Sequence, residues 1–379
     1  MTVEARIQAA VSNQLLMIAV LGDAAAVEHQ HPVGLLNGGQ TMSDDQRGAA
    51  AEEAVQRLMK VVFGGRVQGG RRLIENHHFG VRQDHARNRQ ALASLAEELG
   101  VGYRVFEASS GATQALDGVR VFLNFAGPFA HTAPALMQAC IEAGVDYLDI
   151  TAEITVYRLA ERLGDLASEA GVMLMPGVGW DVVPTDSLAV RLARRTPDPR
   201  ALRIALQVPG SMSRGSAMSV GEIVAAGVMA RVDGELVATP DAAAQPFDFG
   251  DGPVLCEPLS FGDLVTAWHS TQIPDIAMYV HIAADAFPQG DLALLPDGPT
   301  AAEREAHRAR AVVEVTAADG AVSRSVIETV NGYTFTPLSA IEAARRVLIG
   351  ERQPGFETPA RVFGSDFAEC IEGTVISDD

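Results

Sequence analysis

Hydrophobic and polar positions follow two different periods between residues 90 and 179. Amphipathic stretches with apolar residues every three or four positions, each closed by a glycine, predict helices, and short apolar runs between them predict strands. The predicted helices cover 90–100, 132–144 and 155–171, and the predicted strands cover 119–127, 145–151 and 172–179. Apolar strands that alternate with helices of this length are typical of a parallel sheet with helices on both faces.

The pattern changes after residue 200, where strands follow one another with fewer helices between them. Asp233-Gly234 and Asp319-Gly320 are residue pairs that tight hairpin turns favour. The predicted strands cover 202–208, 230–238, 275–283 and 311–330, and the predicted helices cover 215–230 and 337–350. Both patterns together predict an α/β chain, with a Rossmann-like doubly wound parallel sheet and a second α+β domain containing an antiparallel sheet.

The same patterns divide the chain into four expected segments. These are a poorly ordered or atypical segment at 1–58, a dinucleotide-binding Rossmann domain at 59–185, an α+β substrate domain at 186–336, and a C-terminal helix and strand at 337–379 that return to the Rossmann domain. Two explanations of the atypical segment stay open. Translation begins at Met59, or the segment is read in the wrong frame.

Composition excludes several classes of function. A net charge of −19 argues against binding to nucleic acid through bulk charge. The three cysteines form no CxxC pair, which argues against a zinc site and a disulfide framework. The apolar run at 15–22 is too short to cross a bilayer. We therefore expect a cytoplasmic protein with no metal, no transmembrane segment and no nucleic-acid partner.

Residues 60–76, KVVFGGRVQGGRRLIEN, have the order strand, glycine cluster, helix. This order suits the pyrophosphate of a dinucleotide, because glycines let the backbone approach the phosphates and the N–H groups of the helix start bind them. The candidate glycines are Gly64, Gly69 and Gly70. Downstream, Arg87 would favour the 2′-phosphate of NADP, and a solvated position at a helix start is an equally open interpretation of this arginine.

Three later segments, 124–129, 147–153 and 176–186, end predicted parallel strands and are therefore expected at one edge of the sheet. The candidate cofactor contacts there are Asn124, Ala126, Gly127, Pro128, Phe129, Gly177 and Gly179. Tyr147 and Asp181 are candidate catalytic residues, because a phenol or a carboxyl group can act as a general acid. Asp186 is expected to cap the next helix, and the lone His269 is expected to be structural.

Six stretches between residues 87 and 373 resemble the saccharopine dehydrogenase-like oxidoreductases in sequence and order, with the bacterial trans-acting enoyl reductases as the closest subgroup. They are RNRQALASLAEELG, VFLNFAGPF, AGVDYLDITAE, PGVGWDVVPTDSLA, SFGDLVTAWHSTQIPDI and PGFETPARVFGSDF. The resemblance implies an NADP-binding Rossmann domain whose GxxGxxG loop lies just before Arg87 and Asn88. Gly64 and Gly70 match the first and third glycines of that loop, whereas Val67 stands at the second.

The resemblance also implies an enzyme that uses NADP, or NAD, to transfer hydride to an activated C=C bond of an enoyl or acyl-lipid substrate, a reaction of lipid metabolism. One alternative is a dehydrogenase of an amino-acid-type C=N bond, with Arg214 as a candidate ligand of a carboxylate. A second is a non-catalytic binding protein with a degraded phosphate loop, since Val67 puts a side chain where backbone should meet phosphate. A small-molecule or acyl-chain substrate is expected, and a homodimer is an open expectation.

Overall fold

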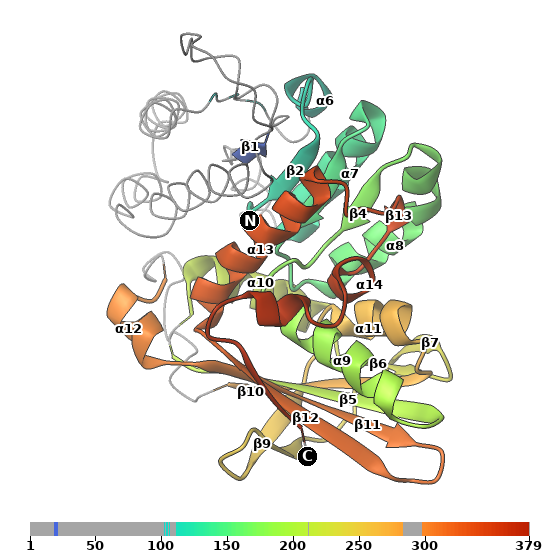
Figure 1. Ribbon diagram of the computed structural model, residues 1–379, viewed down its shortest axis with the longest axis vertical. Helices are drawn as coiled ribbons and strands as arrows, with labels where there is room; N and C mark the ends of the chain where they lie inside the picture. The colour runs from blue at the N-terminus through green and yellow to red at the C-terminus, as the bar shows by residue number, and fades with distance from the viewer. Residues whose placement is uncertain are drawn as a thin grey trace, which may run out of the picture.

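The computed structural model describes residues 19–21, 111–210, 212–282 and 298–378, together with the single positions 102, 104 and 106. This part of the chain contains two main β-sheets that lie one above the other in Figure 1. The predicted glycine loop at 64–70, the residues Arg87 and Asn88, and the atypical segment except for Ala19–Leu21 lie outside the described residues.

The first sheet is largely parallel, as the alternation of strands and helices predicted. Its strands, in spatial order, are β1 (Ala19–Leu21), β2 (Val121–Asn124), β3 (Asp146–Asp149), β4 (Met173–Met175) and β13 (Gly355–Phe356). The four strands from β2 to β13 are parallel, and β1 pairs antiparallel with β2. Every side chain of β2 and β3 is buried, as a sheet covered on both faces requires.

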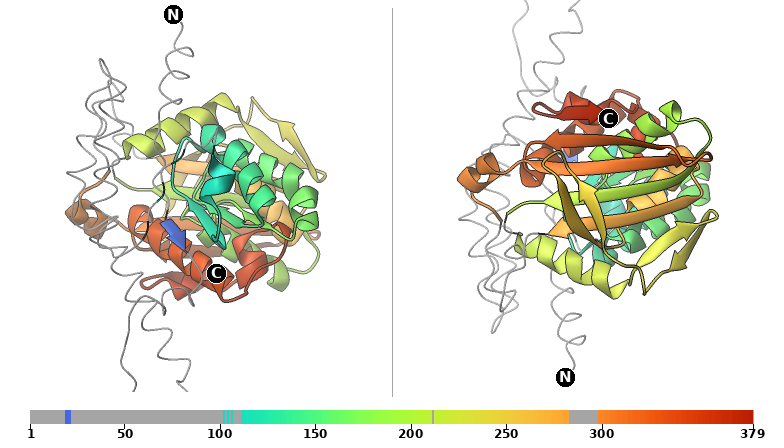
Figure 2. Two further views of the ribbon diagram at one scale, coloured as in Figure 1. Left: turned by 90° about the horizontal axis from the view of Figure 1, so that it is seen from above. Right: turned by 90° about the horizontal axis from the view of Figure 1, so that it is seen from below.

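Helices cover both faces of this sheet. The helices α7 (Phe129–Ala143) and α8 (Ile154–Glu169) pack together, and α8 also contacts β4 and β13. The helix α13 (Gly332–Leu348) contacts β2 and β3 and lies on the opposite side of the sheet in the view from above in Figure 2. The predicted doubly wound Rossmann-like arrangement is therefore confirmed.

The second sheet is mixed. Its main path runs β14 (Val375–Asp378), β12 (Val322–Thr329), β11 (Ala309–Ala317), β5 (Pro199–Val208), β10 (Asp275–Ile282), β6 (Met229–Val232) and β7 (Glu235–Ala238), and β8 (Gln245–Asp248) and β9 (Pro253–Pro258) form a hairpin beside β10. Most pairs are antiparallel, as predicted, and β5 with β10 is the parallel exception among the described strands. Helices α9 (Val183–Arg195) and α11 (Asp263–Thr271) pack on this sheet.

Both predicted hairpins form. Asp233 and Gly234 have φ angles of 50° and 84° between β6 and β7, the left-handed conformation that an Asp-Gly turn supplies. Gly320, with φ of 85°, lies in the turn between β11 and β12.

Two predicted helix limits were wrong. Helix α10 (Arg214–Ala225) ends before residue 230, where β6 has already begun. Helix α13 begins five residues before Pro337, because the Asn331 side chain caps it by accepting a hydrogen bond from Tyr333 N–H at 3.0 Å. The helix therefore contains the proline that the sequence pattern places at its start.

The predicted cap at Asp186 is also wrong. Helix α9 begins at Val183, so Asp186 lies inside its first turn and is completely buried. Its Oδ2 atom instead accepts a hydrogen bond at 2.9 Å from the N–H of Ala360, in helix α14 (Pro359–Phe363). The aspartate therefore joins two helices that are far apart in the sequence.

Candidate functional site

The carboxyl ends of β2, β3 and β4 lie at one edge of the parallel sheet, which faces the second sheet in Figure 1. The loops that follow these strands, 125–128, 150–153 and 176–182, contact helix α10 and the start of α13. In open sheets with parallel strands, ligands bind at this edge. The side chains of these loops are therefore the candidates for contact with a ligand.

Three strand-end residues form one buried hydrogen-bond network. Asn124 Nδ2 donates to Tyr147 Oη at 3.1 Å, and Tyr147 Oη donates to Asp149 Oδ2 at 2.9 Å. Asp149 Oδ1 accepts from Thr151 N–H at 3.0 Å and from Gly177 N–H at 2.9 Å. Burial raises the pKa of Asp149 to about 7, against the lowering effect of these donors. The network fixes the ends of all three strands relative to one another.

Tyr147 has no exposed surface, and its proton is committed to Asp149. Burial and the nearby Asp149 carboxylate raise the pKa of Tyr147 well above its ordinary value. A general acid has to reach its substrate directly or through one water. The assignment of Tyr147 as a proton donor stays a prediction. Its burial and its hydrogen bond to Asp149 give Tyr147 a structural role.

Glu153 occupies the N-terminus of helix α7. Its Oε1 atom accepts from Phe129 N–H at 2.9 Å and from the Ser219 hydroxyl of α10 at 2.8 Å, and its Oε2 atom accepts from Ala130 N–H at 2.6 Å. A carboxylate at a helix start satisfies free N–H groups and interacts favourably with the helix dipole. Because Glu153 is only 1% exposed, this helix start is not open to a phosphate group.

The loop at 125–128 is held by its own hydrogen bonds. Asn124 Oδ1 accepts from Ala126 N–H at 2.9 Å, and the Thr132 hydroxyl donates to the Ala126 carbonyl oxygen at 2.6 Å. Gly127 is partly exposed, and a Cβ atom there would lie 3.8 Å from Ser219 Oγ. The predicted cofactor contacts Ala126 and Gly127 are thus partly exposed residues at the edge, while the Phe129 N–H bonds Glu153 and Pro128 is buried.

The two predicted glycines after β4 are required by packing inside the protein. Gly177 has φ of 78°, and a Cβ atom there would overlap Tyr157 Oη and lie 2.8 Å from Tyr157 Cε1. A Cβ atom on Gly179 would lie 3.0 Å from Thr336 Cγ2. Whether these glycines also contact a cofactor stays a prediction.

Trp180 ties the same loop to the second sheet. Its indole Nε1–H donates to Thr329 Oγ1 at 2.8 Å, and its backbone N–H donates to Thr336 Oγ1 at 3.1 Å. Thr329 ends β12 and Thr336 lies in α13. The start of α13 is therefore fixed beside the carboxyl edge.

Asp181 lies next to a group of buried acids. It is itself half-buried, and desolvation raises its pKa to about 6. Tyr157 and Asp263 are both completely buried. Burial raises the pKa of each, and the negative charge of Asp181 raises it further. Neither oxygen of Asp263 accepts a hydrogen bond from the described residues, and burial raises its pKa well above the usual range. A raised pKa suits a proton donor, and the catalytic assignment of Asp181 stays a prediction.

His269 packs its ring 4.9 Å from the ring of Phe356, and burial lowers its pKa to about 4. A neutral histidine packed against an aromatic ring has a structural role, as expected for a lone histidine.

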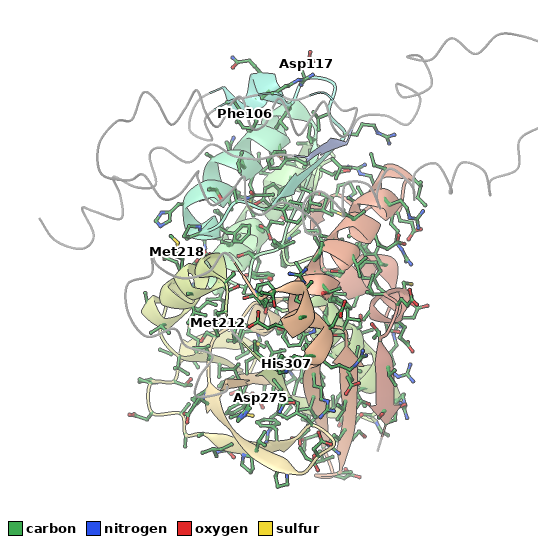
Figure 3. The ribbon with its side chains drawn as sticks, turned by 90° about the vertical axis from the view of Figure 1, so that its left-hand side faces the viewer. Phe106, Asp117, Met212, Met218, Asp275 and His307 are labelled. Atoms are coloured by element: carbon green, nitrogen blue, oxygen red, sulfur yellow. The ribbon has the colours of Figure 1, made fainter. Side chains whose placement is uncertain are left out.

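A group of hydroxyls that the sequence patterns did not predict reaches the carboxyl edge from the second half of the chain. Tyr333 Oη donates to Ser216 Oγ at 2.8 Å and accepts from Ser213 N–H at 2.8 Å. One turn further along α10, Ser219 donates to Glu153. In Figure 3, Met218 is labelled within α10, and Met212 is labelled just before the helix begins. The available signal was the spacing of three between the serines at 213, 216 and 219, which places them on one helix face.

Two cavities of about 500 and 570 Å³ lie against the second sheet. Residues of β6, β7 and β10 line the first, and Asp248, Arg310, Arg324 and Glu328 are among the residues that line the second. Neither cavity includes a residue of the carboxyl edge. Within the described ranges, no helix is long and apolar enough to span a membrane, and no cluster of three or more His, Cys, Asp or Glu residues could hold a metal ion.

One segment of the chain matches a known protein family. Residues 81–175 match the family described as the saccharopine dehydrogenase NADP binding domain, a segment that includes β2, β3 and β4. The matched segment is thus similar to a Rossmann-type, NADP-binding domain of a dehydrogenase family, in agreement with the predicted cofactor class, NAD(P), and the predicted oxidoreductase class. Residues 81–175 are therefore similar to the saccharopine dehydrogenase-like proteins, as the six sequence stretches indicated.

Individual relatives agree with this placement. The chain is 27% identical over 159 residues to the trans-acting enoyl reductase of Mycobacterium ulcerans, covering 38% of each protein. It is 32% identical over 68 residues to a probable mitochondrial saccharopine dehydrogenase-like oxidoreductase of Arabidopsis thaliana, covering 18% of this chain and 15% of that protein. The matched parts therefore span well under half the length of these relatives.

A solved structure shows the same fold. Apo saccharopine dehydrogenase (L-Glu forming) from Saccharomyces cerevisiae has a TM-score of 0.50 and 14% sequence identity, covering 76% of this chain and 92% of that chain. This likeness agrees with the parallel sheet and the second, mixed sheet described above.

The described residues are compatible with a bound dinucleotide and restrict where its phosphates lie. Glu153 fills the start of α7, and the oxygens of Asp149 are all engaged by donors, so neither position offers a free phosphate site. Residues 125–127 are partly exposed at this edge, and their contact with a cofactor stays a prediction. The predicted phosphate loop with Gly64, Gly69 and Gly70 lies outside the described residues, and its contact with phosphate stays a prediction.

Proposed function

We propose that this protein is an NADPH-dependent reductase that transfers hydride to an activated C=C bond of an enoyl or acyl substrate. The observation that carries the proposal is the match of residues 81–175 to an NADP-binding domain, on a sheet whose carboxyl edge faces a group of hydroxyl side chains. The likeness to a trans-acting enoyl reductase favours a C=C bond.

Bound NADPH would supply the hydride. The loop at 125–128 would support the nicotinamide, since Asn124 and Thr132 fix its backbone. Ser216, Ser219 and Tyr333 would face the substrate with uncharged donors and acceptors. Such groups suit the carbonyl of an acyl thioester, whose chain carries no charge to be paired.

A dehydrogenase of an amino-acid-type C=N bond is the alternative within the same class. It would need a cation for the carboxylate of the substrate. Arg214 begins helix α10 and stays the candidate from the sequence. A non-catalytic binding protein is the alternative outside this class, and it requires that the glycine loop has lost its affinity for phosphate.

Cofactor binding separates these proposals first. NADPH fluorescence, followed while purified protein is added, should rise and saturate at micromolar protein concentration. The absence of a change at millimolar cofactor would contradict the reductase proposal and favour the binding protein.

Oxidation of NADPH at 340 nm then identifies the bond that is reduced. We expect turnover with a trans-2-enoyl N-acetylcysteamine thioester and none with 2-oxoglutarate plus lysine. The reverse result would support the C=N alternative. The cytoplasmic location, the place in lipid metabolism and the homodimer remain predictions, which fractionation of cells and light scattering of the purified protein would check.

A further inference from the structure

The hydroxyl group of Ser216 is the end point of a directed hydrogen-bond chain. Its Oγ atom accepts from Tyr333 Oη at 2.8 Å and from Ser213 Oγ at 3.1 Å. A hydroxyl oxygen has two acceptor positions and one proton to donate. Both acceptor positions of Ser216 are therefore used, and none of the residues that the structure describes accepts its proton.

The far end of this chain is arranged to hold a negative charge. Tyr333 Oη accepts from the backbone N–H of Ser213 at 2.8 Å, and that bond strengthens when the phenol loses its proton. The phenol is fixed from two sides, because Asn331 caps the start of α13 and Trp180 holds Thr336 one turn later. Tyr333 is half-buried, so water can return a proton to it.

The chain also has the right place for chemistry at the carboxyl edge. Ser219, three residues after Ser216 on the same face of α10, bonds Glu153 and lies next to Gly127. Tyr333 lies next to Gly332, where a Cβ atom would be 3.4 Å from the ring of Trp180. Ser216 therefore lies between the loop that follows β2 and the loop that follows β4.

We infer that Ser216 donates the proton that completes the reduction, and that Tyr333 replaces it. The inference rests on the proposed function. Hydride from NADPH forms a new C–H bond at one carbon of the C=C bond, the π bond breaks, and its electron pair moves to the neighbouring carbon. That atom takes the proton of Ser216, the proton of Tyr333 moves to Ser216 Oγ, and the phenolate, held by Ser213 N–H, is protonated by water.

The test uses the full-length protein, NADPH and a trans-2-enoyl N-acetylcysteamine thioester. We expect Ser216→Ala and Tyr333→Phe each to lower kcat on the order of 100-fold, the usual effect of losing a general acid. The double variant should be no slower than the slower single variant, because both act in one proton path. The dissociation constant for NADPH should stay within about twofold, since neither hydroxyl is needed to hold the nucleotide in this path.

Two matched variants separate this path from a general structural effect. Tyr279→Phe removes a phenol from β10, where the ring packs on Phe247 in the second sheet, and should leave kcat unchanged. Ser216→Thr keeps the hydroxyl and should recover most of the activity lost in Ser216→Ala.

A spectroscopic readout does not depend on turnover. With [¹³C-ζ]tyrosine in the protein, the resonance missing in Tyr333→Phe is that of Tyr333. It should shift when NADP⁺ and the saturated thioester bind to the wild type, and it should not shift in Ser216→Ala.

The outcomes distinguish the inference from the proposed function. An active wild type with an equally active Tyr333→Phe variant would overturn the proton path and leave the reductase proposal standing. A wild type that neither binds NADPH nor reduces the thioester would overturn both.

Discussion

The contact between Gly177 and Tyr157 gives the sharpest test of the packing at the carboxyl edge. Tyr157 is fully buried in α8, and its hydroxyl donates to the Thr151 carbonyl oxygen at 2.5 Å. A Cβ atom on Gly177 would overlap that hydroxyl and lie 2.8 Å from Cζ of the ring. Gly177→Ala therefore has to displace a buried ring and also hold alanine at a φ of 78°.

The expected cost can be built from three effects. The left-handed backbone conformation costs alanine about 1–2 kcal/mol. Overpacking a buried ring costs about 1–3 kcal/mol. A buried hydroxyl that loses its acceptor costs about 1–3 kcal/mol. Because one movement of Tyr157 relieves part of the overlap, we expect Gly177→Ala to lower the free energy of unfolding by about 4 kcal/mol.

Gly171→Ala is the matched control. Gly171 has a φ of 69°, and a Cβ atom there would meet nothing within 4 Å. Only the backbone cost of about 1–2 kcal/mol should remain. Urea denaturation followed by the fluorescence of the two tryptophans, Trp180 and Trp268, measures both variants. If the two alanine variants differ by less than about 1 kcal/mol, Tyr157 does not occupy the space beside Gly177.

Three further predictions concern the carboxylates and the phosphate loop. Glu153→Gln should lower the free energy of unfolding by about 2 kcal/mol, because an amide N–H₂ would face the donor N–H of Ala130 or Phe129. The same substitution at the exposed Glu142 should lower it by under about 0.5 kcal/mol. Equal urea midpoints for both variants would contradict the placement of Glu153 at the start of α7. Since the folded state raises the pKa of Asp263, it binds a proton more readily than the unfolded chain, so this residue lowers the stability of the wild type as pH rises from about 4 through the raised pKa. Asp263→Asn removes that dependence, and its urea midpoint relative to the wild type should be higher at pH 8 than at pH 5; a constant difference would show that Asp263 is not buried as a neutral acid. Val67→Gly should tighten NADPH binding about tenfold, as measured by cofactor fluorescence, and an unchanged affinity would show that Val67 does not occupy the second glycine position of the loop.

Local sequence patterns predicted the parallel sheet and both hairpins because these features depend on residues close together in the chain. Buried β2 follows from a continuous apolar run, β3 follows from its place between two predicted helices, and the Asp-Gly turns follow from the backbone freedom of those pairs. The start of α13 was predicted too late because proline is usually found in the first turn of a helix. Here the cap at Asn331 sets the start, five residues before Pro337. Asp186 was predicted to be a cap because its actual partner, Ala360, is 174 residues away in the sequence, where no local pattern can reveal it.

In the candidate site too, features set by residues close together in the chain were predicted, and features set by distant residues were not. The loops after β2 and β4 were predicted from strand ends and glycines. The contact of Tyr333 with Ser216 joins residues 117 positions apart, and that of Ser219 with Glu153 joins residues 66 positions apart. No local pattern can reveal such pairs, because they depend on how α10 and α13 pack against the parallel sheet.

The ties around the carboxyl edge have a consequence for how the molecule can move. The bond of Trp180 to Thr329 joins a loop of the parallel sheet to β12 of the second sheet, and the bond of Glu153 to Ser219 joins another of these loops to α10, which lies between β5 and β6 in the sequence. A hinge motion of the two halves would break both bonds at once and would leave the Trp180 indole N–H without its partner, while Glu153 would keep only the N–H donors of Phe129 and Ala130. Entry and exit of small molecules should therefore depend on local rearrangement of short loops, and binding rates should respond to substitutions in those loops more than to solvent viscosity.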